Sequence, residues 1–167
     1  MQSRALEQYN RVLRWHERLD DIHWGRYTPQ PESVEPNELL LRATDELYAF
    51  FMNCYHLKDW IKHDESVATR TQKAVEGYVT QVDNLRICAD ICNSLKHLKL
   101  SRPRFDKPVS LESTVWESVG AEFRHLYVKP VVYVDRQEVD AFELAAGCIK
   151  DWGAFFELHH LNNDNEG

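Results

Sequence analysis

The sequence lacks a hydrophobic run that is long enough to cross a membrane. Its longest apolar stretch, Leu47–Tyr55, contains Asn53, whereas a spanning helix needs about 20 apolar residues. The opening segment MQSRALEQYNRVLRW has no hydrophobic secretory signal. We therefore expect a cytoplasmic protein with reduced cysteines and no membrane contact.

Several chemical signatures are also missing. The sequence has no C-x-x-C pair, Walker motif, dinucleotide-binding glycine motif, serine-hydrolase elbow or zinc-finger spacing. We expect neither a metal nor a cofactor. Cys88 and Cys92 lie four residues apart, and we interpret them as small core residues, with a metal pair as the alternative.

Glycine, proline and positive charge are scarce. Six glycines and six prolines in 167 residues exclude collagen-like and linker-like chains. The 20 basic residues against 27 acidic ones give a net charge of −7, which argues against wrapping duplex nucleic acid but leaves room for a local basic patch. A hydrophobic content of 43% excludes disorder. We expect a single domain over residues 1–161 and a flexible tail over 162–167.

The hydrophobic spacing predicts helices at about 2–20, 37–61, 66–80, 83–98 and 136–161. The second of these is apolar on most sides and is expected to be central, with Asn37 as its N-cap. Trp60 and Trp152 are expected to belong to the core.

The pattern changes before the last helix. Residues 108–119 and 124–134 are rich in Val, Tyr and Trp and flank Gly120, which predicts a β-hairpin within 107–135. Pro130 is expected to place the second strand at the edge of the sheet. The predicted fold class is therefore mainly α, a helical bundle with a β-hairpin inserted before the C-terminal helix.

The fourth predicted helix carries a polar stripe on an otherwise apolar surface. At about 100° per residue, its polar side chains fall within a narrow sector of the helix: Arg86, Asp90, Asn93 and His97. Polar groups on a buried helix need partners. Either these residues form hydrogen bonds that fix the helix register, or they line a polar cleft with His97 at its mouth.

The second predicted helix places His56, Asp59 and His63 on one face. Asp59 can orient a histidine, but two histidines seven residues apart lie about 10 Å apart, which is too far for one ion. If the helix ends near Ile61, only His56 and Asp59 remain on that face. We expect this pair and the stripe of Asp90, Asn93 and His97 to face one another, or a common cleft, on two packed antiparallel helices.

A basic run follows His97, comprising Lys96, Lys99, Arg102, Arg104 and Lys107. It is either a solvated loop or a rim that contacts phosphate groups beside His97.

Two segments carry a family resemblance: Tyr55–Trp60, with the sequence YHLKDW, and Asp90–His97, with the sequence DICNSLKH. Together with the C-terminal segment DRQEVDAFELAAGCIKDWGAFF, they resemble a group of uncharacterised bacterial proteins. The helical arrangement is similar to the HEPN superfamily, which includes toxin and antiviral RNases and non-catalytic binding modules.

The resemblance implies a homodimer of a bacterial defence or mobile-element system that acts on RNA without a metal, by using the ribose 2′-OH. His97 would be the catalytic acid or base, with Asn93 and Asp90 beside it. The substrate-binding residues would be Lys96, His56, Asp59, Lys99 and Arg102. In the family motif an arginine precedes the histidine, but here Asn93 stands where the nearest arginine is expected, and Arg86 lies about 16 Å away along the helix axis.

Three functions stay open at this point. The chain is an RNA-cleaving or RNA-binding HEPN-like protein, a non-catalytic HEPN-like module for a small molecule or a cognate protein partner, or a structural protein whose polar stripes only set helix register.

Overall fold

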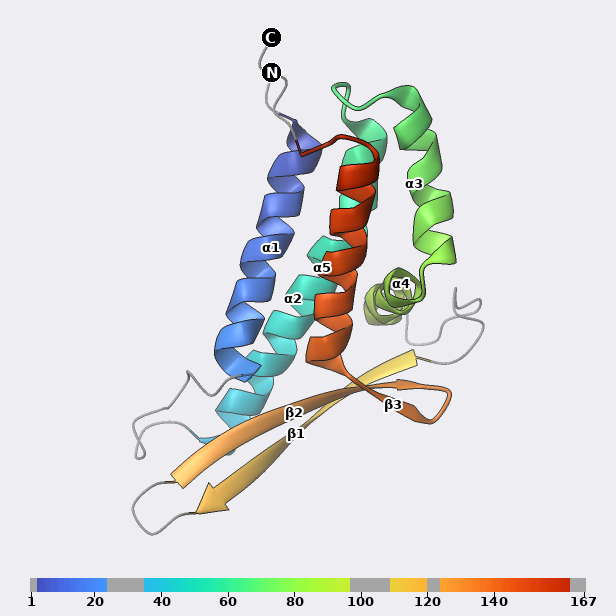
Figure 1. Ribbon diagram of the computed structural model, residues 1–167. Coiled ribbons are helices and arrows are strands. Elements are labelled where there is room, and N and C mark those ends of the chain that lie inside the picture. The colour runs from blue at the N-terminus through green and yellow to red at the C-terminus, as the bar shows by residue number, and fades with distance from the viewer. Residues whose placement is uncertain (1–2, 24–34, 97–108, 120–123, 163–167) are drawn as a thin grey trace.

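The computed structural model describes residues 3–23, 35–96, 109–119 and 124–162 of a mainly helical chain (Figure 1). In chain order its elements are α1 (Arg4–His23), α2 (Pro36–His63), α3 (Thr69–Gln81), α4 (Asp83–Lys96), β1 (Val109–Val119), β2 (Arg124–Val134), β3 (Gln137–Asp140) and α5 (Ala141–Leu158).

The predicted helices are confirmed within these residues, because each one buries a stripe of apolar side chains with helical spacing. Helix α2 ends at His63 rather than near Ile61, so His56, Asp59 and His63 all belong to it. Asn37 lies inside the helix, and Glu35 occupies the N-cap position in extended conformation.

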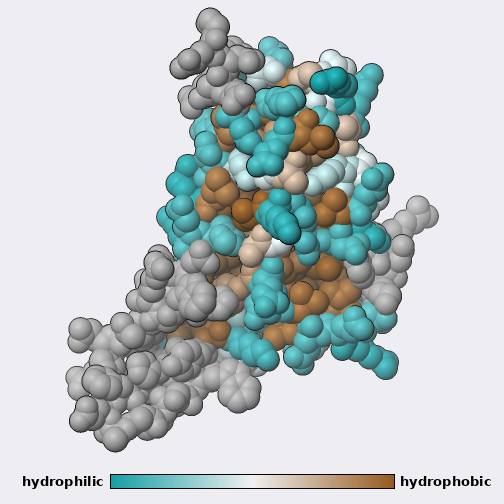
Figure 2. Space-filling view, in the orientation of Figure 1, coloured by the Kyte–Doolittle hydropathy of each residue, from teal (hydrophilic) through white to brown (hydrophobic). Residues whose placement is uncertain are grey.

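Helices α1, α2 and α5 run side by side, α3 and α4 cover one flank, and the sheet crosses one end of the bundle (Figure 1). The largest fully buried side chains include Trp152, Phe50, Phe51, Phe155 and Phe156. Hydrophobic side chains also reach the surface between hydrophilic ones on the face in Figure 2. No helix within the described residues is long and apolar enough to cross a membrane.

The two tryptophans that were expected in the core differ. Trp152 is fully buried, which confirms that prediction, whereas Trp60 is 40% exposed, so its assignment to the core is wrong. Trp60 lies on a part of α2 that the neighbouring helices do not cover, and apolar side chains of this kind are common at protein surfaces.

The predicted hairpin is present as β1 and β2, which pair antiparallel from Val109 opposite Val134 to Val119 opposite Arg124. A third strand, β3, pairs with the other side of β2. Strand β2 is therefore central, and its expected place at the edge of the sheet is wrong. Pro130 is nevertheless tolerated, since the pairing with β3 begins one residue later, at Val131.

The start of the last helix also differs from the prediction. Residues 137–140, expected to be helical, form β3 because Asp135 and Arg136 both adopt positive φ angles of 50° and 72°. Two such residues form the two-residue turn that fits the twist of a hairpin. Helix α5 then begins at Ala141, where the Asp140 carboxylate accepts hydrogen bonds from the backbone N–H groups of Phe142 (2.8 Å) and Glu143 (3.1 Å).

Asp64 joins the end of α2 to the beginning of α1. Its side chain is 4% exposed. It accepts hydrogen bonds from the Ala5 backbone N–H (2.8 Å), the Ser3 hydroxyl (3.0 Å) and the backbone N–H and hydroxyl of Ser66 (3.0 and 2.7 Å). Burial alone would raise the pKa of Asp64, but the hydrogen bonds from Ala5 and Ser66 outweigh it and lower this pKa.

We predict that Asp64→Ala lowers the free energy of unfolding by about 2–4 kcal/mol, because it leaves buried donors of α1 without an acceptor. The folded-state pKa of Asp64 is depressed, so its contribution is present above the unfolded pKa of about 3.9 and is lost as the pH falls through the lower folded value. Urea denaturation at pH 7 and below pH ~4 checks both statements.

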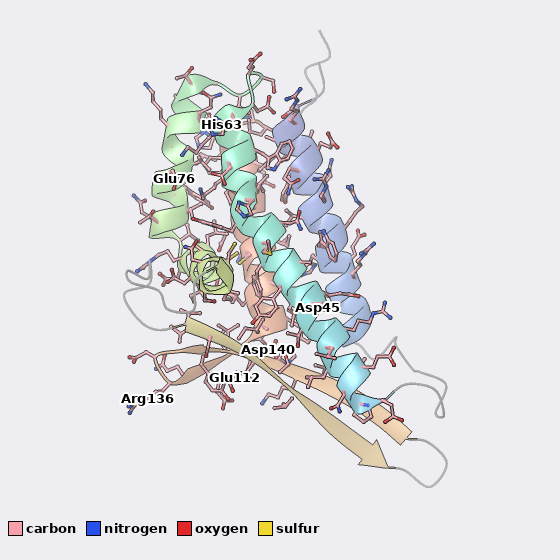
Figure 3. The ribbon with its side chains drawn as sticks, turned by 180° about the vertical axis from the view of Figure 1, so that it is seen from behind. Asp45, His63, Glu76, Glu112, Arg136 and Asp140 are labelled. Atoms are coloured by element: carbon pink, nitrogen blue, oxygen red, sulfur yellow. The ribbon has the colours of Figure 1, made fainter. Side chains whose placement is uncertain are left out.

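Asp45→Ala is the matched control, since Asp45 is an exposed carboxylate on the same helix (Figure 3). Its effect should stay within about 0.5 kcal/mol. Equal destabilisation by the two substitutions would contradict the role of Asp64.

Candidate functional site

A histidine–carboxylate pair lies on the C-terminal half of α2. His56 Nδ1 lies 3.2 Å from Asp59 Oδ2, one helical turn along, and the two side chains are 35% and 41% exposed. This pair was expected from the sequence, and the structure brings it together. When Nδ1 carries the proton and donates it to Asp59, Nε2 keeps a lone pair that can accept a proton.

A buried lysine holds the carboxylate of this pair. Lys58 Nζ, on a side chain that is only 8% exposed, donates to Asp59 Oδ1 (2.7 Å) and to Glu76 Oε1 of α3 (3.1 Å), and it lies 4.8 Å from the centre of the Tyr55 ring. Lys62 Nζ donates to the same Glu76 oxygen (3.1 Å). Figure 3 shows Glu76 on α3 and His63 at the end of α2. The C-terminal half of α2 is thus fixed to α3 by charge.

These contacts shift the acid–base behaviour of the groups. Burial lowers the pKa of Lys58, but hydrogen bonds to Asp59 and Glu76 outweigh it and raise this pKa. Burial raises the pKa of Asp59, but hydrogen bonds from Lys58 and His56 lower it below its usual value. The pKa of Glu76 is lowered against burial in the same way by Lys58 and Lys62. All three groups are therefore charged at neutral pH.

The other side of His56 faces α4. Its Nε2 lies 4.0 Å from Cys92 Sγ, while Cys88 of the same helix donates to the Phe51 carbonyl of α2 (3.4 Å). The face of α4 that meets α2 therefore contains Cys88 and Cys92. These two residues are wholly buried, which confirms their prediction as core residues.

The polar stripe of α4 points elsewhere. At about 100° per residue, Asp90 lies about 160° around the helix from Cys92, and Asn93 lies about 100° from it. Asp90 and Asn93 therefore do not face His56 directly across α2 and α4, because a periodicity shows which residues share a face but not which helix that face meets. His97, the third member of the expected arrangement, lies outside the described residues. Asp90 is fully buried and Asn93 is partly exposed.

The remaining residues predicted for the site lie outside the described part of the chain. These are His97, Lys99 and Arg102, and for Lys96 only the helical backbone is described. The structure thus places four of the predicted residues: it brings His56 and Asp59 together and puts Asp90 and Asn93 on a different face of α4.

The spatial arrangement here resembles that of a nucleophile, a base and an orienting carboxylate, in the order Cys92, His56 and Asp59. Cys92 has no exposed surface, however, and a reactive cysteine needs access to its substrate. In this structure His56 is the group of the three that combines proton-transfer chemistry with solvent contact.

Two surface hollows were not predicted. One, of about 250 Å³, lies beside the pair and is lined by Arg4, Asp59, Trp60, His63 and Asp64. The exposed Trp60 gives it an apolar wall. The sequence analysis missed it because it assigned Trp60 to the core, and only the folded chain brings Arg4 to the end of α2.

The second hollow, of about 400 Å³, lies on α1 and is lined by Arg11, Arg14, Trp15, Glu17 and Arg18. The guanidinium of Arg18 stacks over the Trp15 ring at 4.6 Å. The spacing of Arg11, Arg14 and Arg18 places all three side chains on one helix face. This signal was available in the sequence. We refer to Arg11, Arg14, Trp15 and Arg18 as the arginine face.

Comparison of the chain with protein-family models, with curated proteins and with solved structures finds no match. The function is therefore argued from the chemistry of these residues.

We predict that Lys58→Met lowers the free energy of unfolding by about 1–2 kcal/mol at pH 7, because it leaves Asp59 and Glu76 without their buried cation while the apolar stem is kept. Lys62→Met is the control: it removes a cation from the same Glu76, but from a side chain that is 35% exposed, so its cost should stay below about 1 kcal/mol. Chemical denaturation measures both. A larger effect for Lys62→Met would refute the assignment of Lys58 as the anchor.

Proposed function

We propose that the protein is a HEPN-like RNA-binding protein that cleaves RNA without a metal, through acid–base chemistry around His56 and His97. The observation that carries the proposal is the position of His56. Asp59 holds it at 3.2 Å and its side chain is 35% exposed. It packs on α4 at Cys92, and His97 follows the last described residue of α4 in the sequence.

The arginine face supports the RNA part of the proposal. The chain has a net charge of −7, yet α1 gathers three arginines and a tryptophan around one hollow. Arginine contacts phosphate groups, and aromatic rings and guanidinium planes stack on the bases of single-stranded nucleic acid. The basic run from Lys96 to Lys107 adds further phosphate-binding side chains in the sequence.

The proposed reaction uses the ribose 2′-OH as the nucleophile. His56 Nε2 first turns away from Cys92, which it meets at 4.0 Å, and accepts the 2′-OH proton. The 2′-oxygen then attacks phosphorus, and His97 donates a proton to the departing 5′-oxygen. The products are a 2′,3′-cyclic phosphate and a 5′-hydroxyl. Asp59 stabilises the protonated His56 and fixes its ring, so Asp59 is a positioning residue. Lys96 would donate hydrogen bonds to the phosphate in place of the family arginine.

We predict that the purified chain cleaves single-stranded RNA equally well with and without EDTA, and that a single 2′-deoxy nucleotide blocks cleavage at that position. His56→Ala and His97→Ala should each reduce the rate at least about 100-fold, as expected for the loss of a general acid or base. Gel electrophoresis of labelled RNA, with identification of the cyclic phosphate, provides the measurement.

His160→Asn is the matched control. It removes an exposed imidazole just beyond α5 and keeps a residue that tolerates the positive φ of 54°. Its rate should equal that of the unaltered chain. RNA binding with no cleavage would leave the chain as a non-catalytic module, whereas no binding and no cleavage would contradict the proposal.

A second candidate is a module that binds a small molecule or a short segment of a protein partner. The hollow of about 250 Å³ beside Asp59 favours it, because the hollow combines the exposed Trp60 with the cation of Arg4. Trp60→Ala separates the two candidates. RNA cleavage should persist in this variant, whereas binding of a small molecule or protein segment in the hollow should be lost.

The resemblance also implies a homodimer, and we include it in the proposal. Two apolar side chains of α2 are exposed, Leu41 at 65% and Met52 at 39%. They are eleven residues apart in sequence, which is about three helical turns, so they lie on the same face of the helix. The many aromatic residues do not support dimerisation, since most of the described ones are buried within one chain.

We predict that light scattering reports a mass of about twice the 19.7 kDa of one chain, and that Met52→Glu shifts the protein toward the monomer. Leu158→Glu introduces the same charge at another exposed leucine, 69% exposed at the end of α5, and should leave the mass unchanged. A monomer at micromolar concentration would contradict the dimer.

A further inference from the structure

Three cysteines that are far apart in the sequence meet in the interior. Cys54 of α2, Cys88 of α4 and Cys148 of α5 place their sulfur atoms within 4.8 Å of one another, and none of the three has exposed surface. All are free thiols. We refer to Cys54, Cys88 and Cys148 as the thiol cluster. The fourth cysteine, Cys92, lies on α4 next to His56 and does not belong to it.

Packing accounts for part of this arrangement. The thiols of Cys88 and Cys148 lie 3.4 Å and 3.5 Å from the carbonyl oxygens of Phe51 and Asn84, so both act as weak donors between helices. A buried thiol with such a partner is an ordinary small core residue. On this account alone, the cluster links α2, α4 and α5 and does nothing else.

Trp152 is the observation that packing does not account for. Its indole Nε1–H is buried and has no hydrogen-bond partner within the described part of the chain. A buried donor without a partner is destabilising. The indole nitrogen lies beside the Cys54 sulfur. It can therefore donate to that sulfur once a bound ion gives the sulfur thiolate character.

We propose that the thiol cluster binds one soft metal ion in three-coordinate thiolate geometry, with the Trp152 N–H group donating to the Cys54 sulfur. Three sulfur atoms at about 2.3 Å from a central ion form a triangle with sides of about 4 Å. The observed spacing, within 4.8 Å, needs an adjustment of less than about 1 Å to reach it. Each ligating thiol gives up its proton to the solvent as the ion binds.

The ligand set selects the kind of ion. Thiolates favour soft ions such as Cu(I) and Zn(II). Zn(II) is almost always four-coordinate, and the group of converging ligands in the described residues has three members. Cu(I) is therefore the ion that this site fits best. The indole N–H also offsets part of the negative charge that the ligands bring into the core, as hydrogen bonds to metal ligands commonly do.

The test is an anaerobic titration of the full chain with Cu(I) in the presence of a chromophoric Cu(I) chelator, followed to equilibrium because the buried site opens slowly. The expected result is one tightly held Cu(I) per chain, with ultraviolet charge-transfer absorption and a raised melting temperature, since an ion that binds only the folded state stabilises it. A chain that loses all Cu(I) to the chelator overturns the proposal.

Matched variants locate the ion. Cys88→Ala and Cys148→Ala should abolish retention, whereas Cys92→Ala, which removes an equally buried thiol from the same helix as Cys88, should retain one equivalent. Circular dichroism establishes that each variant is folded. Equal retention by Cys88→Ala and Cys92→Ala would place the ion elsewhere and refute the site.

Trp152→Phe tests the site in a chain that keeps its aromatic packing. Without the indole N–H, Cu(I) affinity should fall by about 10–100-fold, the range typical of partners that hydrogen-bond a metal ligand. Unchanged affinity would overturn the role of Trp152, and preferential binding of Zn(II) in a parallel titration would overturn the three-coordinate assignment.

Discussion

Helix α2 contacts more elements than any other helix of the described residues, and its packing determines where polar chemistry can occur. It packs against the four other helices and against both long strands. The side chains that it buries are mostly apolar, since buried polar groups need partners. Its polar side chains consequently lie where the neighbouring elements leave α2 uncovered. One such place, near α3 and α4, contains His56, Lys58 and Asp59. The position of the candidate site is thus a consequence of helix packing.

The charges around that gap are ordered by burial. Lys58 is the least exposed member, and the carboxylates of Asp59 and Glu76 turn toward it from two helices. A buried cation needs such partners to remain charged. Because Asp59 uses one oxygen for Lys58 and the other for His56, the requirement of the core to neutralise a lysine also fixes the orientation of a surface histidine. Stability and proton chemistry therefore depend on the same carboxylate.

The helices and the hairpin could be predicted because their signals are local: apolar spacing in α2, and runs of Val and Tyr in β2. The turn at Asp135 and Arg136 could not be predicted, because neither residue is a glycine, although both have positive φ.

His56 and Asp59 were predicted as a pair because they lie one helical turn apart on the same helix. The thiol cluster was missed because its cysteines come from three helices, and the spacing of residues on one helix does not show which helices meet. The same limit explains why the stripe with Asp90 was assigned to the wrong neighbour.

The junction between the sheet and α5 has a mechanical consequence. Asp140 is both the last residue of β3, paired with Val131, and the N-cap of α5. No loop separates strand from helix, so the junction contains no compliant segment. The position of the hairpin, which crosses the end of the bundle (Figure 1), is therefore tied through β2 and β3 to the first turn of α5. This is the helix that contributes Cys148 and Trp152 to the interior.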